Sequence, residues 1–210
     1  LPIEQIGLSQ SNLEALRKII AKPYGLVLVC GPTGCGKTTS LHSVLRELNQ
    51  GDRKIWTAED PIEISQQGLC QVQVNARIGW TFAAAMRTFL RADPDVIMIG
   101  EMRDSETANI AIEASLTGHL VFSTLHTNSA AESIARLLEI GLDPFNFSDS
   151  LLAVLAQRLV RRVCPSCGVT AEATQTELDV MLYEYLHSAR DVSESSRATL
   201  LASWRQQYGD

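Results

Sequence analysis

The chain has 210 residues, of which 45% are hydrophobic and 20% are charged, which is enough for one sizeable core with a small appendage. Its longest apolar runs, "LVLVC" and "VIMIG", are far shorter than the roughly 20 residues that span a bilayer, so no direct membrane insertion is expected. A net charge of −6 argues against binding to nucleic acid phosphates, and five cysteines without a repeated spacing favour a reduced, cytoplasmic compartment over a disulfide scaffold.

The acidic excess lies near the end of the chain. Seven acidic residues and three arginines occur from Val169 to Asp210, which gives this tail a net charge of −4 and leaves −2 for the rest. The first residue is Leu1, not Met, and no basic segment precedes an apolar one, so we expect a fragment or a processed form without a signal peptide.

Short apolar runs alternate with segments that carry helix caps through the first 163 residues. In chain order we expect a helix over 11–22, a strand over 26–30, a helix over 37–48, strands over 54–58 and 69–74, a helix over 81–92, a strand over 95–100, a helix over 104–116, a strand over 119–124, and helices over 129–140 and 151–163. The strand over 69–74 alternates and is expected to be antiparallel with one wet face. The other strands are apolar throughout, which predicts an α/β fold with a mostly parallel sheet covered on both faces.

Helix boundaries follow from a few polar residues. Ser11 and Glu14 form a capping-box pattern at the first helix, and Thr81, Asp104 or Ser105, and Ser129 are candidate caps for later helices. Arg103 is expected to pair with the neighbouring Asp104. After Gly168 the sequence becomes polar and helix-prone, so we expect two parts, a nucleotide-binding core over 1–163 and a cysteine-containing helical appendage over 164–210.

Residues 31–38 read "GPTGCGKT" and match the phosphate-loop pattern G-x-x-x-x-G-K-[ST] between an apolar strand and a helix. The glycines let several backbone N–H groups face one anion, and the helix start adds its positive end. Lys37 is expected to reach the β and γ phosphates of ATP, and Thr38 to offer its hydroxyl to Mg²⁺. The alternative is a glycine-rich turn with a chance lysine. The nucleotide-binding residues expected are Gly31, Pro32, Thr33, Gly34, Cys35, Gly36, Lys37, Thr38 and Thr39.

Two groups of acids follow apolar strands. Glu59, Asp60 and Glu63 stand in "TAEDPIE", and Glu101 ends "DPDVIMIGE". Ligands of open α/β sheets bind outside the carboxyl ends of strands, so these acids are expected to face the phosphate loop. There they can hold the waters of Mg²⁺ or activate a water, and Glu101 is the candidate base. The alternative for the first group is a solvated turn with Pro61 at its corner.

Two histidines flank the last apolar strand, in "TGHLVFSTLHTN". His119 precedes the strand and His126 follows it, so only His126 is expected at the carboxyl edge. An imidazole there can donate to a γ-phosphate or to its water, although a histidine at a strand end can also be purely structural.

The four segments "GPTGCGKTT", "TAEDPIE", "DPDVIMIGEMRD" and "TGHLVFSTLHTN" together resemble the Walker A, Asp, Walker B and His boxes of the secretion ATPases. These are the motors of type II secretion and type IV pilus assembly, the GspE/PulE/PilB group. The resemblance covers about residues 1–168. It implies a RecA-like P-loop domain of a hexameric ring, cytoplasmic and docked on inner-membrane platform proteins, that hydrolyses ATP with Mg²⁺.

The resemblance also assigns roles. Glu101 is implied to be the catalytic base, with Glu59 and His126 in the catalytic group. Thr38, Asp60 and Glu63 are implied to serve Mg²⁺. A role in phosphate sensing or at a subunit contact is implied for three further residues, which are His119, Arg87 and Arg91; surface salt bridges are the alternative for the arginines. The family's preceding domain, whose arginines complete the ATP site, is absent here, so slow turnover is expected.

Cys164 and Cys167 form a C-x-x-C step, which is half of a zinc site, a redox pair or neither. The run "AQRLVRRVCPSC" resembles the sequence before the zinc-binding subdomain of the secretion ATPases, whose second C-x-x-C does not occur before Asp210. We therefore expect half of a zinc site, with little zinc bound. The alternatives to an assembly motor are a retraction motor of the same superfamily, a DNA-translocating RecA-like ATPase, and a scaffold that binds nucleotide without hydrolysis.

Overall fold

The computed structural model describes residues 1–188 and 194–208 and divides into two compact units, Leu1–Val160 and Arg161–Asp210. The elements of the first unit are η1 (Ile3–Gln5), α1 (Gln10–Ile20), β1 (Gly25–Cys30), α2 (Lys37–Leu48), β2 (Ile55–Glu59), β3 (Cys70–Gln73), η2 (Ala76–Ile78), α3 (Phe82–Phe89), β4 (Val96–Ile99), α4 (Ser105–Leu116), β5 (Leu120–Leu125), α5 (Ala130–Glu139), α6 (Pro144–Ser150) and β6 (Leu151–Ala156). The second unit carries α7 (Gln175–Ser188) and α8 (Glu194–Tyr208).

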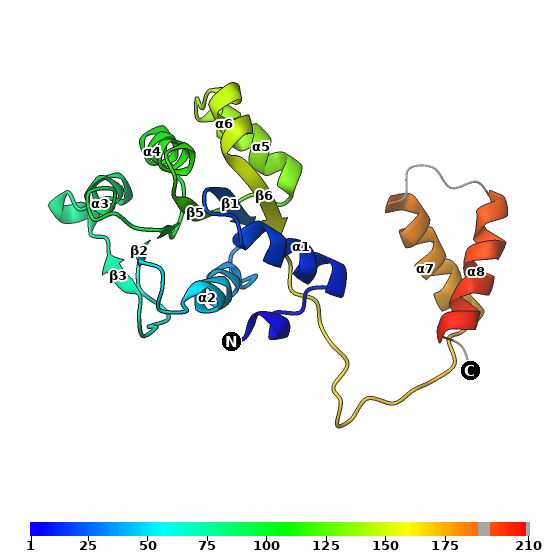
Figure 1. The fold of residues 1–210 in the computed structure, drawn as a ribbon. Coiled ribbons are helices and arrows are strands. Elements are labelled where there is room, and N and C mark those ends of the chain that lie inside the picture. The colour runs from blue at the N-terminus through cyan, green and yellow to red at the C-terminus, as the bar shows by residue number, and fades with distance from the viewer. Residues whose placement is uncertain (189–193, 209–210) are drawn as a thin grey trace. The chain divides into compact units, whose positions relative to one another are not determined.

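The strands of the first unit form one sheet in the order β3-β2-β4-β5-β1-β6, and every neighbouring pair is parallel (Figure 1). The expected α/β class is therefore confirmed. The connection from β5 to β6 passes over β1, so β1 lies between two strands that come late in the chain. The carboxyl ends of all strands face one edge of the sheet, where ligands of such folds bind.

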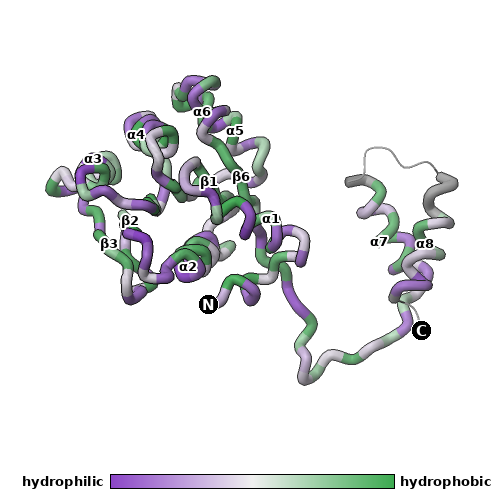
Figure 2. Tube along the Cα trace, in the orientation of Figure 1, coloured by the Kyte–Doolittle hydropathy of each residue, from purple (hydrophilic) through white to green (hydrophobic). Residues whose placement is uncertain are grey.

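Two apolar cores lie on the two faces of the sheet. Alternate residues of β1 point to opposite faces, since Leu26 and Leu28 pack with α3, α4, α5 and α6, while Val27 and Val29 pack with η1, α1 and α2. The helices contribute one apolar side each; α2, for example, alternates between hydrophobic and hydrophilic residues along its length (Figure 2).

The helix caps agree in part with the sequence. Thr81, Asp104 and Ser129 each accept a hydrogen bond from the backbone N–H three residues later, as expected of N-caps. The capping box expected at Ser11 is wrong. The N-cap is Ser9, whose hydroxyl accepts from Asn12 N, and α1 begins at Gln10.

Two strand predictions are corrected. Residues 151–163 do not form a helix, because 151–156 are strand β6, paired with β1 in parallel. The strand over 69–74 is shorter and is parallel, not antiparallel, since β3 pairs with β2 in register from Trp56 and Cys70 to Glu59 and Gln73.

The second unit is a helical pair where it is described. Leu182 of α7 is its buried side chain, and Tyr185 of α7 stacks edge-on against Trp204 of α8 with ring centroids 5.3 Å apart. Across 1–188 and 194–208, no helix combines the length and the apolar character that crossing a bilayer requires.

Candidate functional site

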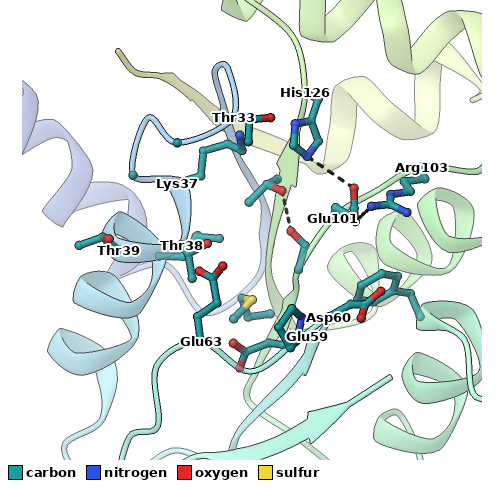
Figure 3. Close-up of a pocket in the computed structure, with 18 residues that line it drawn as sticks. Thr33, Lys37, Thr38, Thr39, Glu59, Asp60, Glu63, Glu101, Arg103 and His126 are labelled. Carbon is teal, nitrogen blue, oxygen red and sulfur yellow. Dashed lines mark hydrogen bonds and ion pairs between the residues drawn. The ribbon is translucent and has the colours of Figure 1, made fainter. Parts of the chain in front are cut away.

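A cavity of about 460 Å³ opens at the carboxyl edge of the sheet (Figure 3). Its walls come from the phosphate loop and the start of α2, from the ends of β2 and β4, and from the end of β5. The lining residues that sequence analysis singled out are Thr33, Gly34, Gly36, Lys37, Thr38, Thr39, Glu59, Asp60, Glu63, Glu101 and His126. The topology thus brings the four motifs to one place.

The phosphate loop needs its glycines for backbone geometry. Gly34 and Gly36 have φ angles of +79° and +88°, a region that side-chain-bearing residues rarely adopt. The ammonium group of Lys37 donates to the carbonyl oxygens of Gly31 (2.8 Å) and Pro32 (3.2 Å). The charged ammonium group therefore lies against the loop and inside the cavity. Phosphate oxygens bound there would compete with the two carbonyl oxygens for its hydrogen bonds. Gly31, Pro32 and Cys35 belong to the loop but do not line the cavity.

Glu101 follows β4 and is 9% exposed. One carboxylate oxygen pairs with the guanidinium of Arg103, and the other lies 3.5 Å from Nε2 of His126, beyond β5. The hydrogen bond to Glu101 raises the pKa of Arg103 above its ordinary value. The pairing expected between Arg103 and Asp104 is wrong, because Asp104 caps α4 by accepting from Thr107 N.

Glu59 faces the cavity with its charge already bound by protein donors. Thr57 Oγ1 (2.6 Å) and Gln71 Nε2 (3.0 Å) donate to Oε1, and His42 Nε2 lies 3.1 Å from Oε2. Burial raises the pKa of Glu59, but the hydrogen bonds from His42, Thr57 and Gln71 outweigh burial and hold the pKa below its ordinary value. Glu59 is thus an anchored anion in the cavity wall.

His42 joins this network from α2, the helix that begins with Lys37. It is 2% exposed, and its Nδ1 has no hydrogen-bond partner among the described residues. Gln66 Nε2 donates to the His42 carbonyl and Gln66 N donates to Gln71 Oε1 (2.7 Å), which ties the segment between β2 and β3 to the same cluster. The helix of the phosphate loop and the end of β2 are therefore fixed to each other.

Oxygen donors suited to Mg²⁺ line the cavity. Asp60 and Glu63 are exposed acids on its wall, and Thr38 lines the cavity from the start of α2 (Figure 3). Across the described parts of the chain, no three His, Cys, Asp or Glu side chains converge closely enough to hold a metal ion. This donor set fits Mg²⁺, which keeps several waters and shares substrate phosphates, and does not fit an ion that needs a full protein cage.

His119 lies at the opposite edge of the sheet from the cavity. Its carbonyl accepts from Gly25 N at the start of β1, and its Nδ1 lies 2.9 Å from the Ala114 carbonyl. The six residues of β5 rise about 3.3 Å each, so roughly 20 Å separate His119 from the carboxyl edge. The phosphate-sensing role implied for it is wrong for the site of this chain; a role at a subunit contact stays a prediction.

Arg87 and Arg91 are exposed and do not line the cavity. Arg87, on α3, pairs with Glu106 of α4 at 2.6 Å, which is the surface salt bridge given as the alternative. Arg91 is exposed, and its role at a contact between subunits stays a prediction.

Cys164 and Cys167 are both exposed free thiols in the second unit. Hydrogen bonds from the backbone N–H of Ser166, then from Cys167, lower the pKa of Cys164 below its ordinary value. A thiolate favoured in this way suits a metal ligand, but a structural zinc site needs four ligands and this turn supplies two.

Sequence reasoning missed three residues at the site. Arg103 was assigned to the surface although it stands two residues after Glu101. His42 shares a helix face with Thr38, four residues earlier, and that spacing was the available signal. Gln157, whose side-chain amide donates to the Cys35 carbonyl at 2.7 Å, gave no signal because its segment was expected to be helical.

A fully parallel sheet with a glycine-rich loop between a central strand and a helix defines a phosphate-loop protein of the α/β class. A model of the family described as "Type II/IV secretion system protein" matches residues 1–201, and the chain belongs to this family. The resemblance stated from the four motifs is thereby confirmed.

Relatives and solved structures agree with this assignment. The chain is 52% identical to type II secretion system protein E of Aeromonas hydrophila over 84% of the chain and 35% of that protein. It is 54% identical to the type IV pilus assembly ATPase PilB of Thermus thermophilus over 80% of the chain and 19% of that protein. The ADP-bound pilus retraction motor PilT matches with a TM-score of 0.66 and 37% identity over 76% of the chain and 48% of that structure. The chain thus spans about a third of the type II relative.

Proposed function

We propose that the cavity binds ATP with Mg²⁺ and that the chain is the motor domain of an ATPase that powers type II secretion or type IV pilus assembly. The observation that carries the proposal is the arrangement of Lys37 and Glu101. The lysine lies in the phosphate loop and the nearly buried glutamate lies across the same cavity. The names of the relatives, which include a type II secretion system ATPase, support hydrolysis as the activity.

The side chains divide the chemistry between them. Backbone N–H groups of the loop and the Lys37 ammonium hold the β and γ phosphates. Thr38 would hold Mg²⁺, and Asp60 and Glu63 would orient its waters; the bound ion would supply charge neutralisation at the phosphates. Glu101 takes the proton of the attacking water, and His126, at 3.5 Å from its carboxylate, donates to the γ-phosphate or to that water. Arg103 must release one Glu101 oxygen for this step.

The proposal for how copies of the chain assemble rests on membership of the family alone. We infer a ring of six copies, cytoplasmic and docked on inner-membrane platform proteins. Zinc is proposed for the Cys164 and Cys167 turn only with two further ligands from elsewhere. The observed ion pair of Arg87 favours a surface role for that residue, so Arg91 is the better candidate for a contact between copies.

A retraction motor is the second candidate, because PilT matches over 76% of the chain. The identities of 52% and 54% to a secretion protein and an assembly ATPase favour the assembly class. A DNA-translocating ATPase is disfavoured by the net charge of −6, and DNA-stimulated hydrolysis would revive it.

The test separates binding from hydrolysis. Glu101→Gln should bind ATP as the wild type does and release no phosphate in the assembled longer protein, because the loop is intact and the base is gone. Lys37→Ala should lose nucleotide binding itself. The matched control is Lys54→Ala, which removes an exposed lysine paired weakly with Asp93 at 3.9 Å and should change neither. Isothermal titration and phosphate release are the measurements. Persistent hydrolysis by Glu101→Gln would assign the base elsewhere.

A further inference from the structure

Gln157 directly follows β6 and contacts the phosphate loop. Its backbone N–H donates to the Cys30 carbonyl at 2.9 Å, which extends the pairing of β6 and β1 by one residue and brings Gln157 beside the loop. Its side-chain Nε2 donates to the Cys35 carbonyl at 2.7 Å, across 122 residues of sequence. One residue therefore contacts the loop through both its backbone and its side chain.

The glycines of the loop leave room for this contact. A Cβ on Gly31 would lie 2.4 Å from the Gln157 carbonyl oxygen and 2.6 Å from Cys35 Sγ, which no side chain tolerates. A Cβ on Gly36 would lie 3.3 Å from Gln157 Nε2. The loop thus packs against Gln157 at its first and at its last glycine, and the approach is too close for any other residue at Gly31.

The hydrogen bond to the Cys35 carbonyl sets the direction of the next N–H group. A trans peptide is planar, and its C=O and N–H point to opposite sides. With the Cys35 oxygen held on the side of Gln157, the Gly36 N–H points away from Gln157. Gly36 lines the cavity, so this orientation favours presentation of its N–H to a phosphate oxygen.

We propose that Gln157 is a positioning residue for phosphate binding, which holds the Cys35–Gly36 peptide so that the Gly36 N–H is available to the nucleotide. The inference rests on the proposed nucleotide binding. Gln157 itself touches no phosphate; its amide acts on the loop backbone. Without the amide donor, the Cys35–Gly36 peptide is free to rotate, and its carbonyl dipole can turn toward the phosphates and repel them.

Two variants of the full chain test the proposal. Gln157→Leu removes the donor at similar size, and Gln157→Asn keeps an amide but is one methylene too short to reach the Cys35 carbonyl. Each should bind ADP roughly five- to tenfold more weakly, the usual effect of one lost hydrogen bond. The affinity for inorganic pyrophosphate, measured by displacement of a fluorescent ADP, should fall by the same factor, because the effect acts through the phosphates.

The control is Gln50→Leu, which deletes a hydrogen bond of the same kind, from Gln50 Nε2 to the Glu47 carbonyl at 2.8 Å, on an exposed surface. It should leave both affinities unchanged. Melting temperatures without nucleotide show whether the Gln157 variants are folded, and if Gln157→Leu does not fold, Gln157→Asn decides. Wild-type affinity in the folded variants overturns the proposal, as does a loss for ADP without a loss for pyrophosphate. A wild-type chain that binds no ADP overturns the proposed function instead.

Discussion

At the scale of single residues, Glu59 shows how the protein keeps a charge inside the cavity wall. Its carboxylate is buried and accepts from Thr57 and Gln71 while His42 faces its second oxygen. The same residue is expected to act in catalysis. Because these partners favour the ionised form, they fix the position of the charge relative to the helix that carries Lys37.

Because the pKa of Glu59 is lowered, the free energy of unfolding depends on pH. A carboxylate with a folded-state pKa below its unfolded value stabilises the fold above the unfolded pKa of about 4.3, and this contribution disappears as pH falls through the folded pKa. Glu59→Gln should therefore lose stability most at neutral pH and approach the wild type in acid. Urea unfolding from pH 7 to pH 3 measures the difference, with Glu63→Gln, an exposed acid of the same segment, as control. A difference that stays constant with pH would contradict the assignment.

The positions of residues at the cavity were predictable where a motif fixed both residue type and position. The phosphate loop, Glu101 and His126 stand at strand ends in the sequence, and parallel topology then brings them together. Arg103 and His42 were missed although their spacing from Glu101 and Thr38 was a signal, because their partners depend on side-chain direction, which the sequence does not give. His119 shows the limit of the resemblance. The sequence alone places His119 at the amino end of β5, whereas the resemblance implied a role at the phosphates, on the carboxyl edge.

At the scale of elements, two predictions failed for identifiable physical reasons. The run "LLAVLA" over 151–156 is apolar without a period, so it suits a buried helix or a buried strand, and only pairing with β1 decides. The strand over 69–74 alternates in polarity, which favoured antiparallel pairing, but β3 pairs with β2 in parallel although the connection over 60–69 carries no helix. The parallel pairing is long-range information that a local pattern does not contain.

The cap of α4 supports the site from outside the cavity. Asp104 accepts from Thr107 N at 2.7 Å and from Thr107 Oγ1 at 3.1 Å, directly after Arg103. Asp104→Ala should cost about 1 kcal/mol and lower the melting temperature by roughly 2–4 °C, as loss of an N-cap does. Calorimetry measures this, and Asp52→Ala, which removes an exposed acid in the turn before β2, should be near neutral. Equal effects for both would deny Asp104 a capping role.

At the scale of the whole molecule, the chain is about a third of its type II relatives. Arginines supplied from another domain or subunit raise NTPase rates by about 10³ to 10⁵. We expect this chain alone to bind ATP and to turn over slowly, and a longer protein in a ring to be faster by a factor in that range. Phosphate release across protein concentrations checks this. Fast, concentration-independent hydrolysis by the monomer would contradict it.

Zinc binding also belongs to this scale, because Cys164 and Cys167 supply only half of a structural site. The purified chain should hold well under one zinc per molecule after dialysis, measured by elemental analysis. A longer protein with two more thiols should hold one, and lose it in a Cys164→Ser variant. Stoichiometric zinc in the 210-residue chain would show that the other ligands are already present.

The place of β6 gives the molecule a mechanical property. The strand is joined to β1 by parallel pairs from Leu26 and Leu151 to Cys30 and Ala156, and the chain continues from its carboxyl end to residue 161 and beyond. A force applied along that continuation would act parallel to the strands, so it would load all the β6–β1 pairs together, in shear. Gln157 lies in the chain between the point of force and those pairs. A force on the C-terminal segment would therefore act first on the contact between Gln157 and the phosphate loop, and only then on the strand pairs of β6 and β1.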